Sequence, residues 1–181
     1  NLEIIWPVRI GLLVIIFLHI WAAIKISAEN KAARPVAYQN FNPTTANYAS
    51  RTMLMSGLII FFFIIYHLLH YTAQMPQINF TGQNFTELHD PKTGYHDIYA
   101  MMVLGFSNLW VSLFYIVAIA LLSLHLSHGL RAMFQSLGWK KKSYANALNC
   151  AATGLAIFIF VGYISIPIAI QFFGFGKEIL K

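Results

Sequence analysis

Residues 98–130 read IYAMMVLGFSNLWVSLFYIVAIALLSLHLSHGL and contain no Asp, Glu, Lys or Arg. A helix needs about 20 predominantly apolar residues to cross the hydrocarbon core of a bilayer, and this stretch is long enough. The whole chain follows the same pattern, because 58% of its 181 residues are hydrophobic and 10% are charged. A soluble domain usually has about a quarter of its residues charged, so this composition argues against a water-soluble protein.

The same criterion identifies further long apolar segments on both sides of this stretch. We expect four membrane-spanning helices, at about 5–26, 53–73, 99–135 and 145–173, with a polar outer loop at 74–98. Alternating apolar and polar segments of about ten residues, typical of a membrane β-barrel, are not seen. The expected fold class is an all-α transmembrane helical bundle, and residues 1–181 form a single domain.

The charges between the spans indicate the orientation. The first and third loops carry most of the Lys and Arg, whereas the second is acidic. The cations concerned are Lys25, Lys31, Arg34 and Arg51 for the first loop, and Arg131, Lys140, Lys141 and Lys142 for the third. By the positive-inside rule, these two loops face the cytoplasm and the second faces outward. The net charge of +6 therefore reflects membrane orientation, and we expect no nucleic-acid partner.

Five histidines lie within the expected spans, namely His19, His67, His70, His125 and His128. Ionisable side chains inside a bilayer are costly, so each one suggests a functional site. The alternative for any single histidine is a neutral ring bonded to a neighbouring helix. The one cysteine, Cys150, excludes an iron–sulfur cluster held by this chain alone, because such clusters need about four ligands, mostly thiolates.

The depth of the histidines in the membrane suggests pairs. His19 precedes Lys25 by six residues, and His125 precedes Arg131 by six, on two spans that run in the same direction. At 1.5 Å per residue, both imidazoles lie about 9 Å inside the cytoplasmic cations, at one level. Two histidines that face each other at one level are the axial ligands that a low-spin haem requires.

His67 belongs to a second level. It follows Arg51 by sixteen residues, which places it about 24 Å from the cytoplasmic boundary and about 15 Å from the first level. We expect it to ligate a second haem, with a partner outside this sequence. Because the chain starts at Asn1 and is apolar within a few residues, we expect a preceding helix to supply that fourth ligand, for five spans in all. A cleaved signal peptide is the competing explanation for this start.

Other residues near these levels are candidates for cofactor contacts. His70 and His128 follow His67 and His125 by three residues, so only one of each pair need ligate. His128 and Arg131 are candidates for bonding haem propionates, and an interfacial polar belt explains them equally well. The small side chain of Gly57 admits either a flat macrocycle or a neighbouring helix.

These residues resemble the cytochrome b membrane subunit of succinate dehydrogenase and fumarate reductase, in its single-anchor, two-haem class. The resemblance covers nearly the whole chain, apart from a first helix. The motifs that carry it are FLH at 17–19, Arg51 with SG at 56–57, YHL at 66–68, LHLSHGL at 124–130 and SLGW at 136–139.

The resemblance implies two haems b, the inner one between His19 and His125 and the outer one between His67 and a first-helix histidine. It implies a flavoprotein subunit and an iron–sulfur subunit on the cytoplasmic face, in the inner membrane of a bacterium. Electrons would pass through both haems to a membrane quinone, which we expect to be menaquinone. Arg34 and Arg51 at the inner face, or His70 and Tyr71 near the outer haem, are candidates for the quinone site.

Three alternatives stay open at this point. A haem b subunit of a hydrogenase or formate dehydrogenase shares the same histidine chemistry. A membrane di-iron hydroxylase or desaturase would need more histidines and carboxylates than the spans contain. A purely structural anchor would leave the histidines without a cofactor.

Overall fold

A computed structural model describes residues 2–33 and 51–180 of the chain. It divides into two compact units, Asn1–Ala46 and Asn47–Lys181, which we describe separately. The described part of the first unit is dominated by one long helix, α1 (Leu2–Ala32), which extends beyond the predicted span at 5–26 in both directions. Its C-terminal end carries an ion pair one helical turn apart, in which Lys25 Nζ lies 3.9 Å from Glu29 Oε1.

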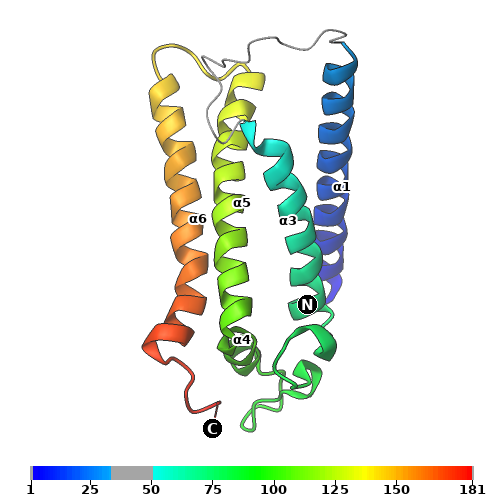
Figure 1. Ribbon diagram of the computed structural model, residues 1–181, viewed down its shortest axis with the longest axis vertical. Helices are drawn as coiled ribbons and strands as arrows, with labels where there is room; N and C mark the ends of the chain where they lie inside the picture. Colours follow the sequence, from blue (N-terminus) through cyan, green and yellow to red (C-terminus); the bar gives the residue numbers. More distant parts are fainter. Residues whose placement is uncertain (1, 34–50, 181) are drawn as a thin grey trace. The chain divides into compact units, whose positions relative to one another are not determined.

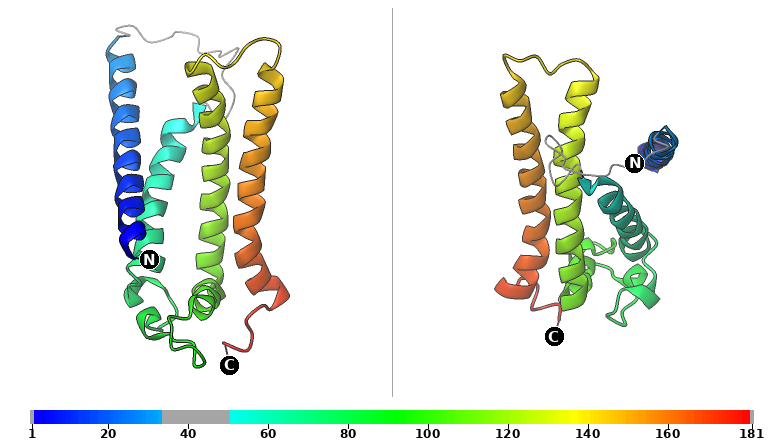
Figure 2. Two further views of the ribbon diagram at one scale, coloured as in Figure 1. Left: turned by 180° about the vertical axis from the view of Figure 1, so that it is seen from behind. Right: turned by 45° about the horizontal axis from the view of Figure 1, so that its top comes forward.

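The second unit contains the other long helices. Helix α3 (Met53–His67) continues into a short π-helix, η1 (Leu68–Thr72), and is followed by α4 (Ile98–Ser107), α5 (Leu109–Ser136) and α6 (Ala145–Phe173). Helix α5 lies between α3 and α6 and packs against both (Figures 1 and 2). The loop between η1 and α4 contains two 3-10 turns, η2 (Pro76–Ile78) and η3 (Phe85–Glu87).

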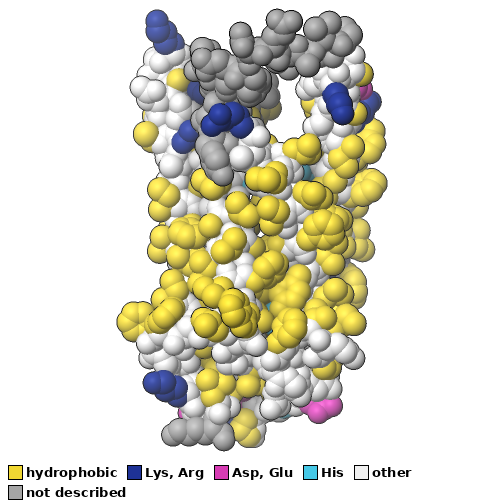
Figure 3. Space-filling model, viewed as in Figure 1, with side chains coloured by type: hydrophobic (Ala, Val, Ile, Leu, Met, Phe, Trp, Pro, Cys, Tyr) yellow, Lys and Arg dark blue, Asp and Glu magenta, His cyan; other side chains and the backbone are white. Residues whose placement is uncertain are grey.

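The all-α fold class is confirmed. Four helices in the described ranges are long and apolar enough to cross a membrane, and these ranges contain no β-strand, only an isolated bridge between His89 and His96. Apolar side chains cover the middle of the face seen in Figure 3, over α5 and α6, and Lys and Arg gather toward the end that carries the α5–α6 loop. The start of α3 lies at this same end, and the loop between η1 and α4 lies at the other (Figure 1). Within the second unit, this arrangement fits the orientation predicted from the loop charges.

The predicted third span at 99–135 is wrong in one respect, because the chain turns sharply at Asn108 and divides the segment into α4 and α5 (Figure 1). The Asn108 side chain accepts hydrogen bonds from the backbone N–H groups of Trp110 and Val111, at 2.9 and 3.3 Å, and so caps the start of α5. The backbone carbonyl groups at the end of α4 also accept hydrogen bonds from side chains. Ser112 Oγ donates to the Phe106 carbonyl at 2.8 Å, and Gln171 Nε2 of α6 donates to the same oxygen at 2.6 Å. Of these two helices, α5 alone is long enough to cross a membrane.

The outer loop is an ordered structure that packs against α3 and η1. Asn79 is fully buried, and its side chain accepts hydrogen bonds from the N–H and hydroxyl groups of Thr81, both at 3.0 Å. Asn84 makes the same pair of bonds with Thr86. These turns place Phe85, which is also fully buried, against the ring of His70. The loop thus covers one of the membrane histidines from the outer side.

Candidate functional site

Two groups of side chains in the second unit bring histidines together with hydroxyl groups. The first group, which we call the inner level, consists of His125 from α5 with Ser56 and Gly57 from α3. The second, which we call the outer level, consists of His67 and His70 from the end of α3 with Tyr115 from α5. Both groups lie on the side of α5 that faces α3.

At the inner level, Ser56 fixes the orientation of the His125 ring. Ser56 is buried, and its Oγ lies 3.2 Å from His125 Nδ1. The same hydroxyl donates to the Met53 carbonyl at 3.1 Å. Its single proton is then used, so the oxygen can only accept a hydrogen bond from the histidine. The tautomer that fits both contacts has the proton on His125 Nδ1, which then donates to Ser56 Oγ. The lone pair of the neutral ring then resides on Nε2, which is the arrangement of a metal-ligating histidine.

Gly57 lies against the His125 ring. A Cβ atom at position 57 would lie 3.4 Å from His125 Cε1, which is an ordinary van der Waals contact, so an alanine fits here without displacing the ring. The His125 ring thus packs against α3 at this glycine, and a place for Gly57 beside a flat macrocycle stays a prediction.

At the outer level, the Tyr115 hydroxyl lies between two histidines. Its oxygen is 3.1 Å from His70 Nδ1 and 3.5 Å from His67 Nδ1. A phenol has one proton to donate and can also accept, so it can donate to one ring while it accepts from the other. Tyr115 is buried among the aromatic rings of α3 and α5, with its ring centroid 5.1 Å from that of Phe63. The hydroxyl is thus held at a fixed point between the two rings.

His67 and His70 differ in their surroundings, although both reach Tyr115. His70 is fully buried, and its ring stacks on Tyr71 with centroids 4.0 Å apart and packs against Phe85. Its Nε2 atom has no hydrogen-bond partner within the described ranges. The His67 side chain is exposed on the surface of the second unit. A planar macrocycle therefore has access to the ring of His67 and not to that of His70.

The two levels are separated by ten residues of α5, from Tyr115 to His125. At 1.5 Å per residue this corresponds to about 15 Å along the helix, which agrees with the separation expected from the sequence for His67 and His125. The π-helix η1 begins directly after His67, where Ala73 N–H donates to the Leu68 carbonyl at 2.7 Å. Single π-helical turns inside α-helices occur frequently at functional sites.

The remaining predicted site residues lie apart from these two groups. His19 is on α1, in the first unit, so its pairing with His125 stays a prediction. His128 is half-buried on α5, one turn beyond His125. Arg51 is exposed just before α3, and Arg34 lies outside the described residues.

The side chain of Arg131 makes a contact that the sequence did not predict. Its guanidinium group donates to Thr153 Oγ1 of α6, whereas His125 contacts Ser56 of α3. The side chain of Arg131 thus points toward α6, and the two residues use different neighbours of α5. The expectation that Arg131 bonds a haem propionate beside His125 stays untested, and in this structure the residue is engaged elsewhere.

Tyr115 was not among the residues singled out from the sequence. Tyrosines are common in the spans of a membrane protein, and nothing in the local pattern distinguishes this one from its neighbours. Ser56 was noted only as part of the SG motif at 56–57. Both roles depend on contacts between residues that are 45 to 69 positions apart in the chain.

Comparison with known proteins gives one match. The family model described as "Succinate dehydrogenase/Fumarate reductase transmembrane subunit" matches residues 27–164, more than half of the chain. No curated protein and no solved structure matches the chain. The matched residues include the inner-level and outer-level groups together with α3, α4 and α5. The chain therefore belongs to the family of succinate dehydrogenase and fumarate reductase transmembrane subunits.

Proposed function

We propose that this chain is the di-haem cytochrome b subunit of a succinate:quinone oxidoreductase. It receives electrons from an iron–sulfur subunit, which is itself supplied by a flavoprotein subunit, on the cytoplasmic face of a bacterial inner membrane. It passes them through an inner and an outer haem b to a membrane quinone. The inner haem is held by His19 and His125, and His67 is a ligand of the outer haem.

The observation that carries this proposal is that His125 and His67 each face a hydroxyl group through Nδ1. Ser56 accepts from His125 Nδ1, and Tyr115 can accept from His67 Nδ1 while its own proton goes to His70. In both cases the ring is left with its lone pair on Nε2. Metal-ligating histidines almost always donate their other ring N–H in this way, which fixes the ring and raises its basicity.

The donor set suits haem, whose iron takes two axial imidazoles and, when bound, gains and loses a single electron. The chain's own residues orient the imidazole rings through their Nδ1 contacts and set the distance between the two levels. His128, one turn from His125 on α5, is the propionate candidate within this unit. Burial and second-shell hydrogen bonds are the means by which the protein tunes each haem potential.

We expect the quinone to be menaquinone. Of the two groups of candidate residues, the contacts favour the arginines at the inner face over His70 and Tyr71. His70 and Tyr71 are enclosed by Tyr115 and Phe85, and a Cβ atom at Gly105 would come within 2.4 Å of the Tyr71 hydroxyl oxygen. A quinone ring has no room between these groups. Arg51 is exposed at the cytoplasmic end, where a quinone carbonyl oxygen has access to a charged donor.

A visible difference spectrum of the purified complex tests the proposed function. We expect the reduced-minus-oxidised spectrum to show low-spin haem b bands, with two haems for each copy of this chain. A flavoprotein and an iron–sulfur subunit should purify with it. A complex without haem absorbance would overturn the cytochrome assignment, and hydrogenase or formate dehydrogenase subunits in place of the flavoprotein would overturn the choice of partner.

The hydrogen bond from His125 to Ser56 gives a more specific prediction. We expect Ser56→Ala to retain both haems and to raise the midpoint potential of the inner haem, because a less basic imidazole stabilises the oxidised iron less well. A neutral hydrogen bond of this kind contributes about 1 kcal/mol. Redox titration monitored at the haem bands measures the shift. A matched control is Ser165→Ala, which removes an exposed hydroxyl that donates only to the Gly162 carbonyl of its own helix. An unchanged inner potential in Ser56→Ala would show that this contact does not tune a haem.

A further inference from the structure

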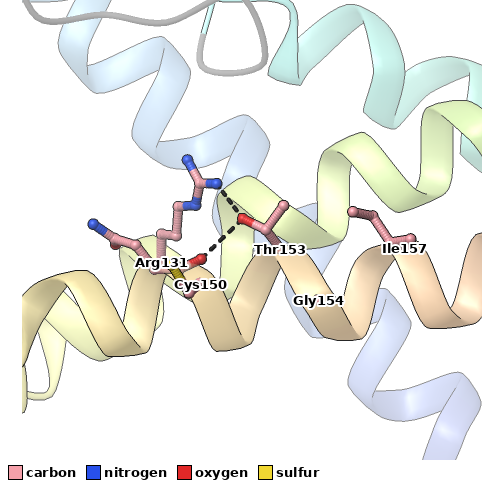
Figure 4. Close-up of a pocket in the computed structure, with 6 residues that line it drawn as sticks. Arg131, Cys150, Thr153, Gly154 and Ile157 are labelled. Carbon is pink, nitrogen blue, oxygen red and sulfur yellow. Dashed lines mark hydrogen bonds between the residues drawn. The ribbon is translucent and has the colours of Figure 1, made fainter.

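A pocket of about 400 Å³ opens between α5 and α6 near the end that carries the α5–α6 loop. It is lined by Arg131 of α5 and by residues of the first turns of α6, namely Asn149, Cys150, Thr153, Gly154 and Ile157. Figure 4 shows the guanidinium group of Arg131 reaching across to Thr153. The Thr153 hydroxyl donates a hydrogen bond to the backbone carbonyl of Asn149, at 2.9 Å. This pocket lies on a different side of α5 from the histidines of the inner and outer levels.

Two polar atoms in this pocket have no partner. Arg131 Nε and Asn149 Oδ1 are both buried, and neither makes a hydrogen bond within the described part of the chain. Leaving a buried charged donor unpaired is costly, more so than leaving a neutral group unpaired. The Thr153 contact satisfies only one of the other nitrogen atoms of the guanidinium group. The pocket therefore offers a cationic donor and an amide acceptor to a ligand that carries both kinds of partner.

The charges around the pocket favour an anion. The α5–α6 loop contributes Lys140, Lys141 and Lys142, and it contains no acidic residue. The described acidic residues of the second unit lie in the outer loop or, as Glu178, beyond the far end of α6. Basic pockets between transmembrane helices on the cytoplasmic side are typical sites for anionic lipid head groups.

We propose that this pocket binds the head group of an anionic phospholipid. The phosphate oxygen atoms accept from Arg131, whose planar fork suits a phosphate group. A hydroxyl group of a glycerol head group donates to Asn149 Oδ1. Below the head group, Ile157 and Val161, one helical turn apart on α6, present an exposed apolar surface suited to an acyl chain.

The shape of the pocket also gives a way to block it without removing a charge. A Cβ atom at Gly154 would meet nothing within 4 Å, so a larger side chain there extends into open space instead of disturbing α6. Gly162, on the same helix, is equally open and does not line the pocket. Gly154→Leu and Gly162→Leu are therefore a matched pair of variants.

The test uses the purified complex, depleted of lipid in neutral detergent and titrated with phosphatidylglycerol or with phosphatidylcholine. Bound lipid is counted by native mass spectrometry. We expect phosphatidylglycerol to bind more tightly than phosphatidylcholine, and Arg131→Gln to weaken its binding at least about tenfold, the ratio that corresponds to 1.4 kcal/mol. Gly154→Leu should weaken it similarly, whereas Gly162→Leu should leave it unchanged.

Four results would overturn the proposal. Equal binding of both lipids, or equal binding by Arg131→Gln and the wild type, would show that Arg131 does not select an anionic head group. Displacement of phosphatidylglycerol by millimolar inorganic phosphate would show that the pocket takes a free phosphate ion. Loss of a haem band in Arg131→Gln, with lipid binding unchanged, would assign Arg131 to a haem propionate instead.

Discussion

Substitution of His125 by alanine is expected to remove the inner haem and to leave the outer haem in place. The low-spin haem b signal of the purified complex should fall to half, because one of two haems loses an axial ligand. Electron transfer from succinate to quinone should fall to the background level, since in the proposed function electrons enter the chain at the inner haem. The measurements are the reduced-minus-oxidised spectrum and the succinate:quinone reductase rate.

A matched pair of variants separates loss of a ligand from loss of the fold. His89→Ala removes an exposed histidine of the outer loop, whose Nδ1 contacts only the Glu87 carbonyl, and both haems should be retained. In His125→Gly, added imidazole should restore the low-spin bands of the inner haem, because it replaces the missing ring. Retention of both haems with unchanged bands in His125→Ala would contradict the proposed ligation.

The second large effect is expected at the outer level, where we propose different roles for two histidines three residues apart. His67→Ala should remove the outer haem and leave the inner one. His70→Ala should retain both, because the His70 ring is fully buried against Tyr71 and Phe85 and has no space beside it for a macrocycle. Spectra of the two variants, recorded at equal protein concentration, measure the difference.

Tyr115→Phe extends this comparison. It removes the hydroxyl that contacts both histidines and keeps the buried ring, so we expect the outer haem to stay bound with a shifted midpoint potential and the inner haem to be unaffected. If His70→Ala loses the outer haem and His67→Ala keeps it, the two roles are reversed. That result would leave the family membership and the inner-level assignment intact.

The hydroxyl groups of Ser56 and Tyr115 have a common effect in these predictions. Each is buried on a helix that neighbours the one carrying the candidate ligand, and each contacts Nδ1. A ring held in this way presents the same nitrogen outward before and after a cofactor binds. The cost of ordering the histidine is then met during folding, which favours tight binding at a fixed geometry.

The family resemblance inferred from scattered motifs was confirmed at the level of the transmembrane subunit. The two-haem class and the axial ligands stay predictions, and of the two proposed ligands of the inner haem His19 lies in the first unit and His125 in the second. The separation of about 15 Å between the two levels followed from counting residues, since an α-helix has a constant rise. The contacts agree with this separation, because α3 meets α5 at His125 on the inner level and at Tyr115, ten residues earlier, on the outer level.

The amino-acid sequence alone predicted four helices long and apolar enough to cross a membrane, which the described residues contain, and an orientation that stays a prediction. Both depend on quantities that add up along the chain, namely apolar length and loop charge. Only the tertiary structure decided where the third apolar segment divides, because both α4 and α5 are apolar and the break at Asn108 is stabilised from elsewhere. Gln171, on α6, satisfies carbonyl groups at the end of α4 that a break would otherwise leave unpaired. The roles of Ser56, Tyr115 and Arg131 were likewise decided by neighbours distant in sequence, since a hydrogen bond depends on the partner that folding brings within reach.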